Sequence, residues 1–214
     1  MYLSRIELAT QNHNTRRALL SPQILHAAIE GCFPNKATEK ERKLWRLDLL
    51  HDKLYLLLLS PEVPSLTHFS EQFCTSGTVG ETKNYDLFLA TIRAGQQWQF
   101  RLRGNAVHSV VENKERGVRG KIYAHVTAQR QREWLIKKST TCGFTLDKHS
   151  FEAVETNQLH FQRNKGNPPV IINATVFEGG LMVTDAEMFT QALTHGVGRA
   201  KAYGCGLLTI AKPT

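Results

Sequence analysis

His26 is the residue best suited to move a proton, and it stands in a segment whose spacing predicts a short helix. Gln23, His26 and Glu30 recur at intervals of three and four residues, while Leu25 and Ile29 supply an apolar side. His26 should therefore face outward. There an imidazole, whose pKa is ordinarily about 6.5, can accept or donate a proton at neutral pH. This chemistry suits attack by an RNA 2′-hydroxyl on its adjacent phosphate. The alternative is a histidine that is merely solvated.

A glycine-rich segment from Gly196 to Gly206 offers a second kind of chemistry. It holds four glycines and two cations in eleven residues, so its backbone N–H groups can approach a phosphate. Gly196, Gly198, Arg199 and Lys201 are therefore candidate RNA contacts. The segment lacks the GxxxxGK[ST] and GxGxxG patterns of nucleotide-binding loops. A helix C-cap followed by a tight turn into a last strand explains it equally well.

Positive charge is concentrated in the second half of the chain. The formal net charge is +8, of which residues 96–214 carry +7, and this balance favours a polyanionic partner. Arg101, Arg103 and Arg119 belong to the densest basic tract, and Arg163 and Lys165 stand at the expected tip between two strands. All five are candidate RNA contacts, with solvated surface charge as the alternative.

Several classes of site and location are disfavoured. The four cysteines have no paired spacing, the nine histidines form no HExxH motif, and magnesium-binding acidic clusters are missing. We therefore expect no metal, no cofactor and no small-molecule substrate. The longest apolar run, Leu54–Leu59, is far short of the roughly 20 residues that span a bilayer. A soluble cytoplasmic protein without a membrane partner is expected.

Two similar series of elements must position these residues. The first is expected to contain strand, helix, strand, strand, helix and strand at 1–8, 22–30, 43–50, 54–60, 65–73 and 85–93. The second is expected to contain the same kinds of element at 98–111, 127–141, 152–162, 170–183, 185–195 and 207–211. This order predicts an α+β protein of two tandem ferredoxin-like (RRM-like) domains with antiparallel sheets, at residues 1–95 and 96–214.

Several ordered motifs together resemble one known family, the CasE-type CRISPR repeat endoribonucleases of type I-E systems. The motifs include Leu25-His26, the segment from Phe100 to Ala106, Phe177-Glu178-Gly179, and the ending from Gly196 to Leu208. The resemblance spans almost the whole chain. It implies two ferredoxin-like domains, and cleavage of a precursor transcript at the base of each repeat hairpin. The product would stay bound as mature guide RNA inside a multi-subunit surveillance complex.

The resemblance also implies roles for individual residues. His26 falls on the family's catalytic histidine, and the reaction would leave a 2′,3′-cyclic phosphate and a 5′-hydroxyl without a metal. The 163–167 hairpin would meet the major groove of the stem. Where the family often has a tyrosine, this chain has Gln23, which can donate a hydrogen bond but not usefully a proton. Candidate supporting groups are Arg16, Arg17, Lys201 and Tyr203.

Two other functions remain open at this level. A catalytically inert subunit would hold the same RNA hairpin within the same complex. Because Gln23 stands where the family often has a tyrosine, that alternative stays open. A basic RNA chaperone with paired ferredoxin-like domains would instead bind RNA without preference for a repeat.

Overall fold

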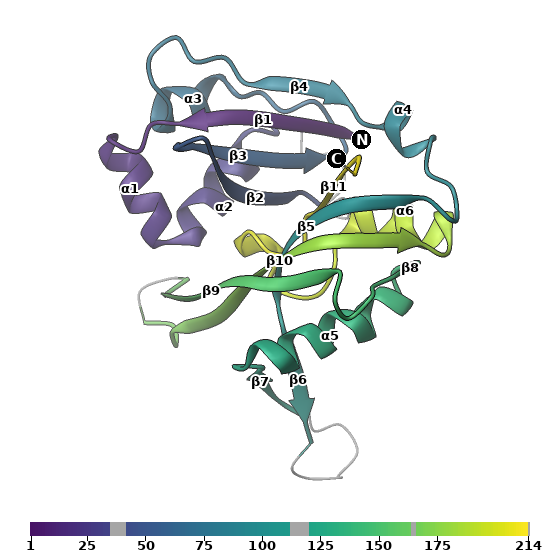
Figure 1. Cartoon of the computed structure of the whole chain (residues 1–214). Helices are drawn as coiled ribbons and strands as arrows, with labels where there is room; N and C mark the ends of the chain where they lie inside the picture. The colour runs from purple at the N-terminus through teal and green to yellow at the C-terminus, as the bar shows by residue number, and fades with distance from the viewer. Residues whose placement is uncertain (35–41, 112–119, 164–165, 214) are drawn as a thin grey trace.

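The computed structural model describes residues 1–34, 42–111, 120–163 and 166–213. Figure 1 shows two sheets, one above the other, with α5 (Ala128–Thr140) beneath the second. All sheet pairings in the described part of the chain are antiparallel. No described helix is long and apolar enough to cross a bilayer.

The first unit has the strand order of a ferredoxin-like fold. Its elements are β1 (Tyr2–Leu8), α1 (His13–Leu20), α2 (Pro22–Gly31), β2 (Leu44–Leu50), β3 (Lys53–Ser60), α3 (Thr67–Phe73) and β4 (Glu81–Asn84). The sheet runs β2-β3-β1-β4, so β3 lies between β1 and β2. Helices α1, α2 and α3 cover it through a core that includes Leu25, Phe69 and Trp45. This confirms the predicted fold. The sequence did not predict α1, which Asn12 caps by accepting a hydrogen bond from the Asn14 N–H.

The strand predicted at 85–93 is wrong. The fourth strand is β4, and the chain then turns into the short helix α4 (Asp86–Leu89). The Asn84 side chain accepts a hydrogen bond from the Asp86 N–H at 2.8 Å, which starts the turn. Asp86 also binds the N-terminal amino group at 2.8 Å. Leu89 and Ile92 then pack into the core of the second unit. The domain boundary after residue 95 stays a prediction.

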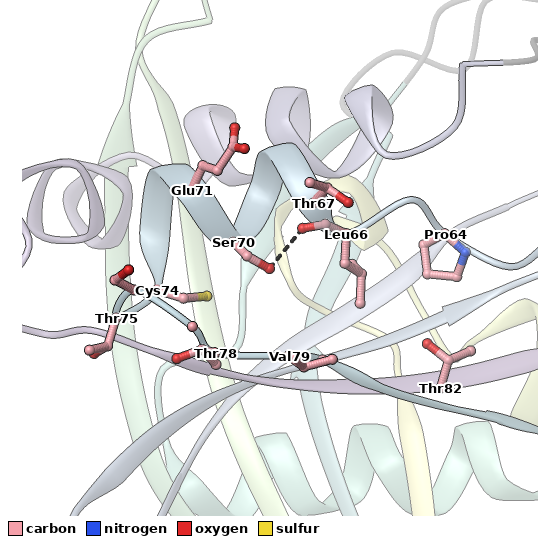
Figure 2. Close-up of a pocket in the computed structure, with 13 residues that line it drawn as sticks. Pro64, Leu66, Thr67, Ser70, Glu71, Cys74, Thr75, Thr78, Val79 and Thr82 are labelled. Atoms are coloured by element: carbon pink, nitrogen blue, oxygen red, sulfur yellow. Dashed lines mark hydrogen bonds between the residues drawn. The ribbon is translucent and has the colours of Figure 1, made fainter.

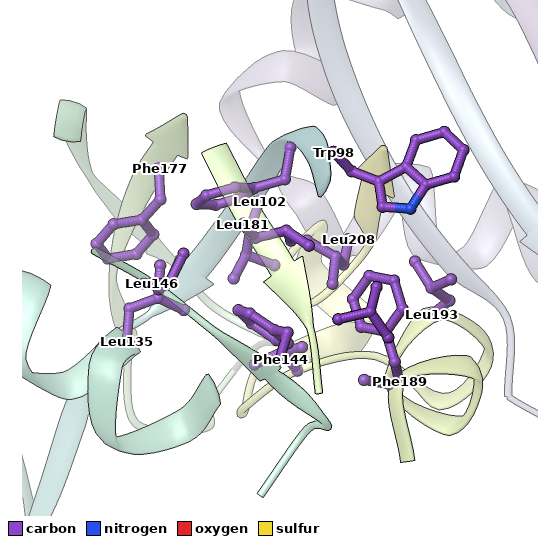
Figure 3. Packing of buried hydrophobic residues seen from close by; sticks show 14 of the residues in the cluster. Trp98, Leu102, Leu135, Phe144, Leu146, Phe177, Leu181, Phe189, Leu193 and Leu208 are labelled. Atoms are coloured by element: carbon purple, nitrogen blue, oxygen red, sulfur yellow. The ribbon is translucent and has the colours of Figure 1, made fainter. Parts of the chain in front are cut away.

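The second unit repeats this order with an inserted hairpin. Its main elements are β5 (Gln97–Asn105), α5, β9 (Phe151–Phe161), β10 (Val170–Val183), α6 (Ala186–His195) and β11 (Leu208–Ala211). The sheet runs β11-β5-β10, and β9 and the short β8 (Phe144–Thr145) both pair with β10. The strand predicted at 98–111 divides at Ala106, after which β6 (Val107–Val110) pairs with β7 (Lys121–Ala124). The core of the second unit contains the aromatic side chains of Phe144, Phe177 and Phe189 (Figure 3).

One buried arginine ties the two units together. Arg46 of β2 is 1% exposed and uses all five of its N–H donors. Two bind the carboxylate of Asp48 at 2.7 Å, and the others reach the carbonyls of Arg101 and Leu207 and the hydroxyl of Thr209. Because Leu207 and Thr209 come from the end of the chain, this network fixes the glycine-rich segment against β2.

Candidate active site

His26 projects from α2 beside the residues that anchor this helix. Pro22 occupies the first turn, and Leu25 and Ile29 are buried, which leaves the His26 side chain 31% exposed as the spacing predicts. Its Nδ1 lies 3.9 Å from a carboxylate oxygen of Glu30, one turn later. The other Glu30 oxygen accepts a hydrogen bond from Lys43 at 2.8 Å. The imidazole is thus open to solvent or substrate and lies beside the Glu30 carboxylate.

Tyr203, from the far end of the chain, meets His26 edge to face. It lies in the 3-10 helix η1 (Lys201–Tyr203), and the two ring centroids are 6.1 Å apart at 70°. Phe161 of β9 packs against Tyr203 with centroids 4.7 Å apart. The guanidinium carbon of Arg163 lies 5.7 Å from the centre of the Tyr203 ring. The structure thereby joins His26, Tyr203 and Arg163, which sequence reasoning named separately.

The glycine-rich segment is held by close contacts with tryptophans. Trp45 Nε1 donates to the carbonyl of Ala202 at 3.3 Å. Gly204 has φ +77° and a Cβ there would lie 2.8 Å from the Trp45 ring, so glycine is required on two grounds. Gly196 ends α6, and its N–H bonds to the Ala192 carbonyl. The expected helix C-cap is therefore confirmed, while phosphate binding by Gly196 and Gly198 stays a prediction.

The predicted supporting residues do not all gather around His26. Lys201 donates a hydrogen bond to the carbonyl of His195 at 2.6 Å. Burial lowers the pKa of Lys201, and the positive charge of nearby Arg42 lowers it further. Arg16 and Arg17 are exposed on α1. Gln23 lines a separate cavity of about 500 Å³ between α2 and α3. The catalytic roles of these four residues stay predictions.

The predicted RNA contacts fall in different environments. Arg103 lines a cavity of about 340 Å³ together with Leu25 of α2 and Trp45 of β2, close to the His26 helix. Arg101 instead forms ion pairs with Asp48, at 3.3 Å, and with Glu178, so its charge already has partners. Its contact with RNA stays a prediction. Arg119 and Lys165 lie outside the described residues.

Elsewhere in the described residues, the largest candidate for a competing catalytic centre is not built for catalysis. A cavity of about 720 Å³ between α3 and the 74–82 segment includes Ser70, Glu71 and Cys74 (Figure 2), but Ser70 donates to the Leu66 carbonyl. Burial raises the pKa of the Cys74 thiol to about 11, which keeps it protonated and weakly nucleophilic. In the described ranges, no three His, Cys, Asp or Glu residues are grouped to hold a metal ion.

Sequence reasoning missed the residues that hold the site together. Phe161, Trp45 and Lys43 all stood in expected strands, and no role in the site was assigned to them. The alternation of β9 and β2 could have placed the two aromatic rings on inward faces. Nothing in the sequence indicates that they contact the last fifteen residues of the chain.

The fold and site define a class of proteins with two ferredoxin-like units whose candidate active-site residues come from both units. The chain belongs to the family described as CRISPR associated protein, whose family model matches residues 1–212. The resemblance found in the sequence is confirmed.

Two curated relatives match over nearly their full lengths. The CRISPR-associated endoribonuclease Cse3 of Thermus thermophilus is 27% identical, with 99% of this chain and 100% of that protein covered. The CRISPR system Cascade subunit CasE of Escherichia coli is 27% identical, with 99% of each covered. Among solved structures, Cse3 bound to a 19-nucleotide RNA has a TM-score of 0.82 at 25% identity, with 99% of this chain and 100% of that chain covered. Thermus thermophilus Cse3 bound to an RNA representing a pre-cleavage complex has a TM-score of 0.80 at 25% identity, covering 98% of each.

Proposed function

We propose that this protein is a metal-independent endoribonuclease that cuts CRISPR repeat hairpins in a precursor transcript and keeps the mature guide RNA bound. The observation that carries the proposal is the contact between His26 of the first unit and Tyr203 of the second. Support comes from two relatives of matching length, one named as an endoribonuclease and the other as a Cascade subunit. An RNA-bound Cse3 structure shares the fold.

The reaction needs one proton removed and one supplied. The 2′-hydroxyl attacks the adjacent phosphorus, and the bond from phosphorus to the 5′-oxygen breaks, which leaves a 2′,3′-cyclic phosphate and a 5′-hydroxyl. His26 either accepts the proton of the attacking hydroxyl or donates one to the leaving oxygen, and water makes the other transfer. Glu30 lies beside the imidazole, and its ion pair with Lys43 limits the negative charge that Glu30 presents to the RNA.

Tyr203 acts in this scheme by fixing the imidazole of His26. Its ring contacts both Phe161 and Arg163, so it can hold the histidine where the family tyrosine is replaced by Gln23. Lys201, Arg16 and Arg17 are proposed to stabilise charge on the phosphorane. These roles concern positioning and electrostatics rather than proton transfer.

RNA binding is assigned to the basic groups of the second unit. Arg163, with Lys165, is proposed to meet the stem, Arg103 to bind the backbone of the stem, and Arg199 to bind the backbone outside the stem. By analogy with the relative named as a Cascade subunit, the protein stays with its product among other subunits. That role places it in the cytoplasm.

Cleavage of a labelled repeat RNA in excess EDTA tests the reaction type. A single cut at the base of the stem should persist in the chelator and disappear when a 2′-deoxy nucleotide replaces the attacking hydroxyl. Loss of the cut in EDTA, with recovery on adding Mg²⁺, would contradict the proposal. So would cleavage of the deoxy substrate.

One structural observation favours a second candidate, an inert subunit that only holds the hairpin. Gln23 lines the cavity between α2 and α3, and its amide cannot usefully transfer a proton. Tight binding of the repeat hairpin without any cut would support this candidate. Equal affinity for an unrelated hairpin of the same length would instead indicate an RNA chaperone.

A further inference from the structure

A further cavity lies where β5, β6 and α5 meet the glycine-rich segment. Its volume is about 310 Å³, at the lower end of the range of about 300–1,000 Å³ that holds small ligands. The lining residues with recognisable chemistry are Asn105, His108, Trp134, Lys138, Gly198 and Arg199. His26 is not among the residues that line it, so this cavity is separate from the candidate catalytic histidine.

Asn105 gives the cavity an unsatisfied acceptor. The residue ends β5 and is 8% exposed, and its Oδ1 has no hydrogen-bond partner among the described residues. Burying an amide oxygen without a donor is costly, and native proteins rarely do so without a reason. A ligand that brings an O–H or N–H into the cavity would satisfy this oxygen once the Asn105 amide turns toward the cavity.

Two cationic side chains line the cavity and favour an anionic ligand. Lys138 lies in the last turn of α5, one turn after Trp134, and Arg199 is exposed in the glycine-rich segment. Neither forms an ion pair with any residue that the structure describes. Lys138 is also close enough to Lys201 to help lower its pKa, although burial has the larger effect. Like charges gathered in this way stabilise a bound phosphate.

The walls suit a flat group. A Cβ at Gly198 would lie 3.0 Å from the Trp134 ring, so the backbone of the glycine-rich segment rests directly on this ring. In another part of the lining, His108 is exposed, and its ring stacks on His125 with centroids 4.6 Å apart and planes 26° apart. An exposed ring that is supported by a second ring in this way can stack with a nucleobase.

We propose that this cavity binds one unpaired nucleotide of the RNA, adjacent to the stem. Its phosphate contacts Lys138 and Arg199, its ribose 2′-hydroxyl donates to Asn105 Oδ1, and its base packs against His108. The inference rests on the proposed function, because it assumes that the ligand of the protein is RNA. The single-nucleotide volume and the acceptor for a 2′-hydroxyl favour an unpaired ribonucleotide over a base pair or DNA.

The test compares two labelled RNAs, a blunt repeat hairpin and the same hairpin with single-stranded flanks. The variants are Asn105→Ala and the double variant Lys138→Ala/Arg199→Ala, with thermal unfolding measured to confirm folding. Each should weaken binding of the flanked RNA about tenfold and of the blunt hairpin less than about twofold. The double variant should also reduce the salt dependence of flanked-RNA binding by about one phosphate contact, because both cations meet the same phosphate. Lys137→Ala, on the same turn of α5 but outside the cavity lining, is the matched charge control and should affect both RNAs equally.

A 2′-deoxy scan of the flanks identifies the nucleotide. At one position, the 2′-deoxy substitution should weaken binding to the wild-type protein but not to Asn105→Ala. The removed hydroxyl and the removed acceptor belong to the same hydrogen bond, so losing both costs no more than losing one. Equal losses on both RNAs, or no loss, would overturn the inference, while wild-type cleavage of the repeat would leave the proposed function intact. A wild-type protein that neither bound nor cut the repeat would contradict both. If Asn105→Ala abolished binding of 5′-AMP and left the flank preference unchanged, the ligand would be a free nucleotide, and the RNA assignment would be wrong.

Discussion

Replacing Arg46 with Met should destabilise the protein more than any surface ion-pair change. The substitution leaves the Asp48 carboxylate buried, and among the residues that the structure describes only the Arg101 Nε, at 3.3 Å, remains as a charged partner. It also removes donors from the carbonyls of Arg101 and Leu207. Breaking a buried ion pair on one side typically costs about 3–5 kcal/mol, and we expect a loss in this range. Cleavage should fall as well, because the network fixes the glycine-rich segment beside His26.

Urea unfolding measures this loss, with two comparison variants. Arg5→Ala removes an exposed partner of Glu81 and should cost less than about 1 kcal/mol. Arg46→Lys keeps the charge but cannot supply five donors in a planar fork, so it should recover only part of the stability. A loss of less than about 1 kcal/mol for Arg46→Met would refute the view that Arg46 joins the two units.

Three further predictions concern single sites. Gly204→Ala should cost about 2 kcal/mol of unfolding free energy. Gly95 has φ +84° but open space around it, so Gly95→Ala should cost about 1 kcal/mol from the backbone alone. Equal losses for the two variants would exclude the clash with Trp45. Tyr203→Phe should cleave within about threefold of wild type, and Tyr203→Ala about 100-fold more slowly, since the ring fixes His26. A large loss in Tyr203→Phe would instead assign a role to the phenol. Burial raises the pKa of Cys32 and of Cys205 to about 11, so iodoacetamide at pH 8 should label them only after unfolding, and rapid native labelling would contradict their burial.

The sequence predicted the elements with strong local signals. The helix at Pro22 has an apolar side and a proline in its first turn, and the 54–60 strand has a continuous apolar run. The error at 85–93 arose because a short apolar run such as Leu87–Leu89 fits a strand and one helical turn equally well. Helix α1 was missed because it is mostly polar, with only Thr15 and Ala18 buried.

The candidate site was predictable in part for a similar reason. Helical spacing placed His26 on a surface, but its contact with Tyr203 depends on the packing of two units, which no local pattern encodes. The unpartnered oxygen of Asn105 gave no signal either, since an asparagine at a strand end is ordinarily expected in a turn. Contacts across the two units therefore had to come from the structure.

Single-turnover cleavage by His26→Ala, measured together with its affinity for the repeat RNA, tests the central claim most directly. Cleavage should fall by about 100- to 10,000-fold, the usual contribution of a general acid or base, while the dissociation constant should change less than about threefold. His68→Ala is the matched control, because His68 is also a helix-surface histidine beside a glutamate, Glu71, at 3.4 Å. It should cleave at the wild-type rate. Cleavage by His26→Ala within about tenfold of wild type would contradict the assignment of His26 as the catalytic residue.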